Sequence, residues 1–271
     1  MTSSAPGGRA RLDEELVRRG LAESRSRARA LILAGDVLIN GTPASRAGSL
    51  VSERDMVTMS AKPRYVSRGG EKLAHALEAF CLDVEGKVAA DLGASTGGFT
   101  DCLLQAGATR VYAVDVGYGQ LHERIRQDDR VVVLERTNAR TLDSLPEKVS
   151  VVVIDVSFIS LRLILPVAAR LLQPGGVCVP LIKPQFEAGK REVGRGGVVR
   201  DPDVHRRVLR EICDAAEGVR FAVAGLVQSP LLGPAGNREF LALLTVDAGS
   251  ADKAVQDLID GVVPSPEGES Q

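Results

Sequence analysis

The feature that most constrains this chain is a series of short, almost wholly apolar segments that alternate with helical segments from residue 88 onwards. Strands that are apolar along their whole length are buried on both faces, as in parallel sheets covered by helices. No helical segment separates the last two, so we expect them to run antiparallel at one edge. The predicted strands are residues 88–92, 110–116, 131–136, 149–156, 177–183, 221–227 and 239–246. The sequence therefore predicts an α/β domain with a seven-stranded, mostly parallel, Rossmann-like sheet.

A smaller unit precedes this sheet. Two amphipathic segments before residue 36 predict helices, and Asn40-Gly41 is the strongest short signal for a β-hairpin. A chain of 271 residues is long enough for about two domains. We expect a small α+β domain at 9–61, a linker at 62–70, the α/β domain at 71–246 and a flexible acidic tail at 247–271.

Charge is unevenly distributed, although the formal net charge is only −1. Residues 1–72 carry 13 Lys and Arg against 8 Asp and Glu, whereas residues 247–271 carry 1 Lys against 6 acids. Any contact with a polyanion is therefore expected to begin at the N-terminal domain.

Composition argues against several classes of protein. The 4 Cys are too few for a disulfide scaffold and show no CxxC spacing, so we expect a reducing compartment and no metal site. The most apolar stretch, 163–182, is interrupted by polar residues and glycines, and no signal-peptide pattern is present. We therefore expect a cytoplasmic protein without membrane contact.

A glycine-rich turn follows the first predicted strand, in the run DLGASTGGF at 91–99. Such a turn lets a ligand approach the backbone closely, and an acid at the end of the next strand can accept both hydroxyls of a ribose. The turn lacks the glycine spacing of a dinucleotide fingerprint and the GK[ST] of a phosphate-binding loop. S-adenosylmethionine fits best; the alternatives are a turn that only packs helix on strand, and a nicotinamide cofactor. The predicted cofactor-binding residues are Asp91, Gly93, Ser95, Gly97, Gly98, Asp115 and Asn138.

Two lysines and two acids are expected to converge at one edge of the sheet. Asp155 and Lys183 end apolar strands, and Glu239 begins the antiparallel strand, all at the edge where open sheets bind ligands. Lys72 opens the helix before the first strand and can fold over that edge. A ribose hydroxyl needs a base to become a nucleophile, and a lysine in a low dielectric can lose its charge and act as that base. Taken singly, each residue also fits a solvated strand end.

These residues lie in motifs that resemble the TlyA (haemolysin A) family of ribosomal RNA 2′-O-methyltransferases, over about residues 9–246. The motifs are SRGGEKL (67–73), DLGASTGGFTD (91–101), VDVGYGQL (114–121), ERTNAR (135–140), DVSFIS (155–160), KPQFEAGK (183–190), GGVVRDP (196–202) and GNREF (236–240). The resemblance implies an S4-like RNA-binding domain followed by a class I, FtsJ/RrmJ-type methyltransferase domain that uses S-adenosylmethionine. It also implies a catalytic tetrad, which maps onto Lys72, Asp155, Lys183 and Glu239, and Lys183 is the preferred base.

The resemblance further implies methyl transfer to the 2′-hydroxyl of cytidine in 16S ribosomal RNA, 23S ribosomal RNA or both. We expect a monomer that acts on ribosomal subunits. Charge alone allows the basic N-terminal region to be merely a solvated helix face, and the resemblance favours RNA contact. The predicted RNA-binding residues are Arg11, Arg18, Arg19, Arg25, Arg136 and Arg140.

Three other functions are weighed against this one. They are a non-catalytic RNA-binding or ribosome-assembly protein, a membrane-active haemolysin, and a pseudouridine synthase with the same type of N-terminal domain. Labelled methyl transfer, liposome leakage and calorimetry with S-adenosylmethionine distinguish them in turn.

Overall fold

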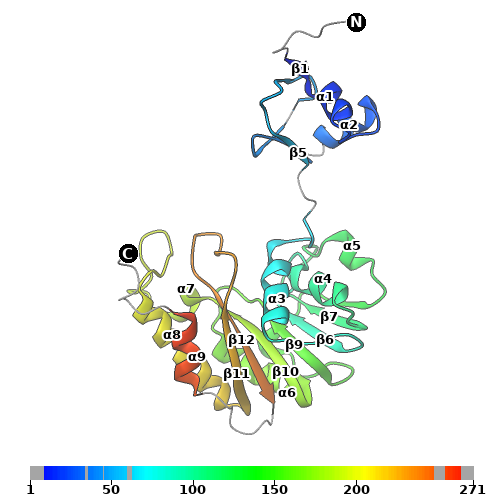
Figure 1. Cartoon of the computed structure of the whole chain (residues 1–271). Coiled ribbons are helices and arrows are strands. Elements are labelled where there is room, and N and C mark those ends of the chain that lie inside the picture. The colour runs from blue at the N-terminus through cyan, green and yellow to red at the C-terminus, as the bar shows by residue number, and fades with distance from the viewer. Residues whose placement is uncertain (1–8, 34–35, 45, 60–62, 247–253, 264–271) are drawn as a thin grey trace, which may run out of the picture. The chain divides into compact units, whose positions relative to one another are not determined.

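The structure is a computed structural model and describes residues 9–33, 36–44, 46–59, 63–246 and 254–263 (Figure 1). The chain divides into two compact units, Met1–Arg64 and Tyr65–Gln271.

In the first unit, helices α1 (Leu12–Arg18) and α2 (Arg25–Leu33) share one apolar core with short strands. Strands β3 (Thr42–Pro43), β2 (Val37–Ile39) and β5 (Val57–Met59) form an antiparallel sheet in that order, and β1 (Ala10–Arg11) pairs with β4 (Leu50–Val51). Asn40 and Gly41 turn β2 into β3 with φ of 50° and 81°. Both lie in the left-handed region that a two-residue hairpin turn requires, which confirms the predicted hairpin.

The second unit contains a seven-stranded sheet in the order β11-β12-β10-β9-β6-β7-β8. The five strands from β10 to β8 pair in parallel, whereas β12 is antiparallel to both of its neighbours. This confirms the predicted mostly parallel sheet with an antiparallel pair at one edge. The strands are β6 (Val88–Leu92), β7 (Arg110–Val114), β8 (Val131–Leu134), β9 (Val149–Ile154), β10 (Leu172–Ile182), β11 (Phe221–Gln228) and β12 (Phe240–Val246).

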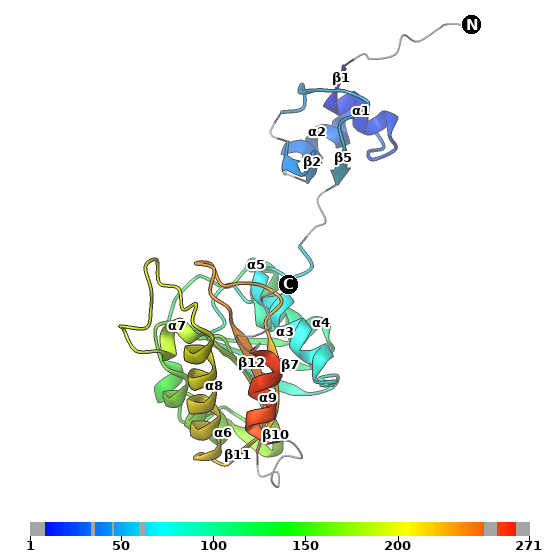
Figure 2. The ribbon, with the colours of Figure 1, turned by 60° about the vertical axis from the view of Figure 1, so that its left-hand side comes forward.

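Helices cover both faces of this sheet, as its apolar strands require (Figures 1 and 2). In β9, Val151 and Val153 join the core under one set of helices, while Val152 and Ile154 join the core under the other. The first set is α3 (Arg68–Ala79), α4 (Gly98–Gln105) and α5 (Glu123–Arg126); the second is α6 (Leu165–Leu171), α8 (Pro202–Glu217) and α9 (Val255–Val262). Within the described residues, no helix combines the length and the apolarity that a membrane crossing needs.

Helix α3 begins at Arg68, three residues before the predicted start of its domain at residue 71. The Gly69-Gly70 pair disfavours a helix by propensity, but tertiary packing overrides it. A Cβ on Gly70 would lie 2.2 Å from the ring of the buried Tyr65, so the helix start and the preceding chain pack as only a glycine allows. Part of the expected linker is therefore helical. Residue 62, also in that linker, lies outside the described residues.

The expectation of a flexible tail is wrong for residues 255–262, which form α9. Ile259 and Val263 are buried against the core that also holds Val208 and Ile212 of α8. Figure 2 shows α9 beside α8. Apolar residues at 255, 258, 259, 262 and 263 follow the spacing of one helix face, a signal that the acidic and small residues around them obscured. Residues 247–253 and 264–271, also assigned to that tail, lie outside the described residues.

Candidate active site

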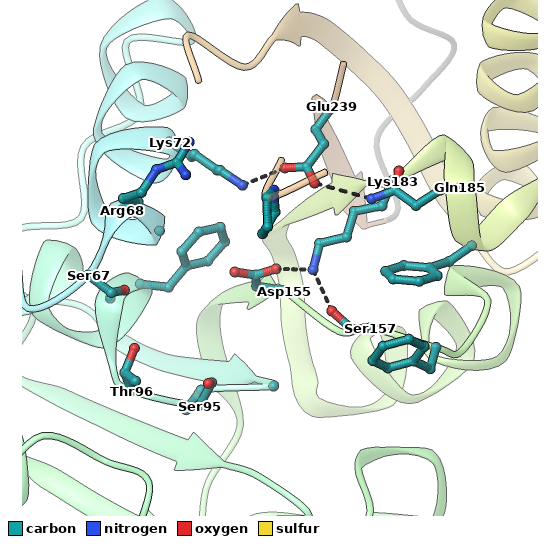
Figure 3. Close-up of a pocket in the computed structure, with 18 of the residues that line it drawn as sticks. Ser67, Arg68, Lys72, Ser95, Thr96, Asp155, Ser157, Lys183, Gln185 and Glu239 are labelled. Carbon is teal, nitrogen blue, oxygen red and sulfur yellow. Dashed lines mark hydrogen bonds and ion pairs between the residues drawn. The ribbon is translucent and has the colours of Figure 1, made fainter. Parts of the chain in front are cut away.

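A cavity of about 730 Å³ opens at the edge of the sheet where the parallel strands end (Figure 3). Its walls come from the start of α3, the glycine-rich turn after β6, the chain after β9 and β10, and the connection between β11 and β12. All four residues predicted for catalysis line it: Lys72, Asp155, Lys183 and Glu239. Because parallel strands end at one edge of the sheet, side chains that are up to 167 positions apart in the sequence meet in this cavity.

The four charges form two ion pairs. Lys72 Nζ pairs with Glu239 Oε2, and both side chains are buried. Lys183 Nζ lies 2.6 Å from Asp155 Oδ1 and also donates to Ser157 Oγ at 2.9 Å. A buried charge is tolerated when it has a partner of opposite sign. Each ammonium therefore has its own carboxylate within one cavity.

Sequence reasoning missed several residues of this cavity. Ser157 contacts Lys183, and Gln185 of α7 (Pro184–Glu187) donates through Nε2 to Glu239 Oε1 at 3.4 Å. Both lie two positions beyond a predicted residue, Asp155 and Lys183, so their place in the same motifs was the available signal. Arg68 also lines the cavity and donates through Nη2 to the carbonyl of Leu232 at 2.6 Å, which links α3 to the β11–β12 connection.

Glu187 holds the loop that follows Asp155. Its carboxylate accepts from Ser160 Oγ at 2.6 Å and from the Leu161 N–H at 2.8 Å. Burial raises the pKa of Glu187, opposed by these two hydrogen bonds. The loop carries Ser157 and Phe158, and the Phe158 ring lies 4.9 Å from that of Phe186 between centroids. The one sequence signal for this loop-holding role was the acidic Glu187 within the motif KPQFEAGK at 183–190.

A second cavity of about 520 Å³ adjoins the first and shares Gly93, Ser95, Asp155, Ser157 and Phe158 with it. The predicted residues Asp115 and Asn138 line this second cavity. Asp115 is held by the N–H groups of Ser95 and Gly117, at 2.8 and 2.7 Å, and each of its oxygens keeps a further lone pair. Asn138 Oδ1 accepts from the Arg140 N–H at 3.0 Å, so it caps a short helical turn as well as lining the cavity.

The glycines of the glycine-rich turn beside these cavities have no room for a side chain. Gly93 has a φ of 91°, and a Cβ there would lie 2.8 Å from the carbonyl oxygen of Asp155. A Cβ on Gly98 would lie 2.1 Å from Ser67 Oγ. Gly97 turns the chain into α4 with a φ of 92°, and a Cβ there would lie 2.8 Å from the Leu121 side chain.

Asp91 lies beneath this turn and is fully buried. Its Oδ2 accepts from Thr100 Oγ1 at 2.7 Å, while Oδ1 has no hydrogen-bond partner among the described groups. Burial raises the pKa of Asp91 to about 7, and the charges of Asp155 and Asp115 act in the same direction. Asp91 lines neither of the two cavities, so its contact with a cofactor stays a prediction.

The predicted RNA-binding arginines fall into two groups. Arg136 and Arg140 are exposed on the second unit, and the Arg136 guanidinium lies 4.2 Å from the centroid of the Tyr118 ring. In the first unit, Arg11 and Arg25 pair with Asp13, and Arg18 pairs with Glu15.

Arg19 differs from the other three predicted RNA-binding arginines of the first unit. It donates to Glu15 Oε1 at 2.5 Å and to the carbonyls of Asp55 and Ser52, at 2.9 and 3.3 Å. Only 23% of its side chain is exposed. The structure therefore gives Arg19 a bracing role within its unit, and RNA contact by this residue stays a prediction.

These residues could hold an adenosine-type cosubstrate. Asp115 is suited to the ribose, and the glycine-rich turn with Asp91 beneath it is suited to a charged end. Within the described part of the chain, no group of three or more His, Cys, Asp or Glu could hold a metal ion.

The sheet order and the two adjoining cavities define a class I methyltransferase. The family model of the FtsJ-like methyltransferases matches residues 65–245, and that of the S4 domain matches residues 10–57. Together with the relatives described next, these matches show that the chain belongs to the TlyA family, as the motifs indicated.

Two curated relatives and one solved structure illustrate the similarity. The chain is 47% identical to the 16S/23S rRNA (cytidine-2′-O)-methyltransferase TlyA of Mycobacterium tuberculosis, over 93% of this chain and 96% of that protein. It is 42% identical to Hemolysin A of Brachyspira hyodysenteriae, over 86% of this chain and 98% of that protein. A solved structure from Streptococcus thermophilus matches with a TM-score of 0.71 and 42% identity, over 93% and 95% of the two chains.

Proposed function

We propose that this protein transfers a methyl group from S-adenosylmethionine to the 2′-hydroxyl of cytidine in 16S and 23S ribosomal RNA. The observation that carries the proposal is the meeting of two Lys–acid pairs in a cavity that adjoins a cavity suited to adenosine. We also propose that the protein acts as a monomer. A ribosomal RNA substrate supports a cytoplasmic location.

The residues present fit S-adenosylmethionine. Asp115 keeps lone pairs that would accept the ribose hydroxyls, and Asn138, which lines the same cavity, would hydrogen-bond the adenine. The charge of Asp91 beneath the glycine-rich turn would favour the amino group at the methionine end. When bound, S-adenosylmethionine supplies an electrophilic methyl group on a positively charged sulfur. The two cavities share five lining residues, so a group bound in one would lie next to a group bound in the other.

Lys183 is the base in this proposal. In its neutral form, Nζ takes the proton of the ribose 2′-hydroxyl as the oxygen–methyl bond forms and the sulfur–methyl bond breaks. Asp155, at 2.6 Å, stabilises the ammonium that results, and Ser157 at 2.9 Å fixes the direction of Nζ. The products are the 2′-O-methyl ribose, a neutral thioether and protonated Lys183, so atoms and charge balance.

Lys72 and Glu239 act as positioning groups. Their ion pair joins α3 to the start of β12 across the cavity, and Gln185 adds a further hydrogen bond to Glu239. The pair keeps the Lys72 ammonium at the cavity wall beside its counter-charge. Orientation of the two reactants supplies much of the rate in such an in-line transfer.

The first unit serves to dock the enzyme on ribosomal RNA. The support is its match to the S4 domain and its arginine-rich helix α2. Phosphate contacts by arginine give affinity that falls steeply with salt.

The test is transfer of radiolabelled methyl from S-adenosylmethionine to isolated ribosomal subunits that lack this modification. We expect label in both subunits, recovered as 2′-O-methylcytidine after nuclease digestion. Binding of subunits without any transfer would instead identify a non-catalytic RNA-binding protein. Leakage of liposomes without transfer would identify a membrane-active protein.

A further inference from the structure

In the first unit, one buried carboxylate holds three guanidinium groups. Asp13, in the first turn of α1, is fully buried. Arg11 Nε lies 3.0 Å from Asp13 Oδ1, and Arg29 Nε lies 3.0 Å from Oδ2. Arg25 Nη2 lies 3.3 Å from the same Oδ2. The three arginines come from β1 and from two successive turns of α2, so Asp13 is the point at which they meet.

The contact with Asp13 leaves part of each arginine side chain exposed. Their side chains remain 44%, 49% and 53% exposed for Arg11, Arg25 and Arg29. A guanidinium has five N–H donors, and Asp13 uses one or two of each. One negative charge among three positive ones leaves the cluster positive; the exposed Glu14 also faces it, through Arg25 at 3.0 Å. The hydrogen bonds from these arginines hold the pKa of Asp13 well below its usual range, so it stays ionised.

Glu15, two residues along α1, provides a contrast. It binds Arg18 through both oxygens and Arg19 through one, but Arg19 is turned inward to the carbonyls of residues 52 and 55. The Glu15–Arg19 pair therefore braces the unit. Asp13 instead gathers side chains whose remaining donors face solvent.

We infer that Asp13 is a positioning residue that arranges Arg11, Arg25 and Arg29 into a binding site for a phosphate group of ribosomal RNA. The inference rests on the proposed function, which makes ribosomal RNA the partner of this unit. Flexible arginines lose side-chain freedom when they bind, and a carboxylate that already fixes them reduces that loss. Planar guanidinium groups are also suited to phosphate oxygens, because several N–H groups can donate to one phosphate.

Two explanations of the basic surface make opposite predictions. If only the total charge matters, removing a negative charge tightens RNA binding, and exchanging Arg for Lys changes nothing. If Asp13 arranges the arginines, Asp13→Asn weakens binding although it adds one net positive charge, and Arg29→Lys weakens binding at constant charge.

The experiment measures binding of the full chain to ribosomal subunits that lack the methylation, without methyl donor, at fixed salt. We expect Arg29→Lys to weaken binding about fivefold, because lysine cannot donate to Asp13 and phosphate in the geometry of a guanidinium. Arg27→Lys is the matched control: Arg27 is exposed on the same helix and has no ion pair in the described part of the chain. We expect less than a twofold change for this control. Equal affinities for the two variants would overturn the inference.

The second arm compares Asp13→Asn with Glu23→Gln, which removes the same charge from an exposed acid that has no ion pair among the described residues. Weaker binding by the first variant and unchanged or tighter binding by the second support the inference, whereas tighter binding by both contradicts it. Asp13 is buried, so its variant is checked by circular dichroism. Arg29, half exposed, carries the test alone if the Asp13 variant does not fold.

A kinetic readout separates this inference from the proposed function. Arg29→Lys is expected to raise KM for ribosomal subunits and leave kcat unchanged, since the catalytic groups belong to the other unit. A wild-type chain that binds subunits but transfers no methyl group contradicts the proposed function and leaves the inference standing. A wild-type chain that methylates normally, with Arg29→Lys equal to Arg27→Lys, contradicts the inference alone.

Discussion

Lys183 Nζ lies 2.6 Å from Asp155 Oδ1, and the two residues reach this contact from the ends of neighbouring parallel strands, β10 and β9. Lys72 and Glu239 form a second pair across the same cavity. We propose that the Lys183–Asp155 pair accepts the proton, whereas the second pair fixes the geometry of the site.

The Lys72–Glu239 pair is expected to contribute to stability as well as to catalysis. Glu239→Gln leaves a buried ammonium without a counter-charge, so the free energy of unfolding should fall by about 3 kcal/mol. The double variant Lys72→Met/Glu239→Gln removes both charges and should recover part of this loss while staying inactive. Urea denaturation and methyl transfer measure the two effects. Single and double variants of equal stability would show that the pair is not a buried ionic unit.

Asp91 gives the apo protein a pH-dependent stability. Its pKa is about 7 in the folded chain against an ordinary value of 3.8, so the folded state keeps a proton that the unfolded state has released. The free energy of unfolding should therefore fall as pH rises from about 4 through about 7, by at most about 4 kcal/mol. Asp91→Asn should lack this decline and become the more stable chain above pH 7. Parallel pH profiles of the two chains would contradict the prediction.

The same substitution should weaken cofactor binding. Asparagine cannot offer a negative charge to the amino group of S-adenosylmethionine, and we expect affinity to fall about tenfold. Isothermal titration calorimetry above pH 7, where the folded wild-type Asp91 is mostly ionised, measures this directly. Unchanged affinity would remove Asp91 from the proposed cofactor contacts.

Gly98 is expected to tolerate no side chain. A Cβ would lie 2.1 Å from Ser67 Oγ and 3.0 Å from the backbone nitrogen of Gly70, so the Ser67 side chain must move and the start of α3, the helix that carries Lys72, must give slightly. We expect Gly98→Ala to lose about 2 kcal/mol of stability and most methyl transfer. Adding Ser67→Ala should relieve only part of this, because the contact with Gly70 remains. Thermal unfolding and activity of the single and double variants are the measurements, and full rescue would place the clash at Ser67 alone.

Glu187 is expected to act through the loop that follows Asp155. Glu187→Ala removes the acceptor of the Ser160 hydroxyl and the Leu161 N–H, which should loosen the loop that carries Ser157. We expect kcat to fall about tenfold with little change in KM for ribosomal subunits. Ser160→Ala removes one of the two bonds and should have a smaller effect of the same kind. A change confined to KM would point instead to a role in RNA binding.

The sequence was sufficient to predict the sheet and the meeting of the four charged residues. Apolar strands and the residues that end them are local signals, and the rule that parallel strands end at one edge converts those signals into proximity. Close packing and long-range contacts determine the features that the sequence did not predict. The start of α3 at Arg68 depends on a close contact between Gly70 and Tyr65 that propensity does not express. The bracing role of Arg19 depends on carbonyls 33 and 36 positions away.

Proton transfer from the ribose hydroxyl to Lys183 is tested by single-turnover methyl transfer with the Lys183→Ala variant. Lys190→Ala, an exposed residue of the same motif, is the matched control. We expect the rate for Lys183→Ala to fall about a thousandfold, with S-adenosylmethionine affinity within about threefold of wild type and a normal rate for the control. A Lys183→Ala chain that keeps more than about a tenth of the wild-type rate would show that Lys183 is not the base.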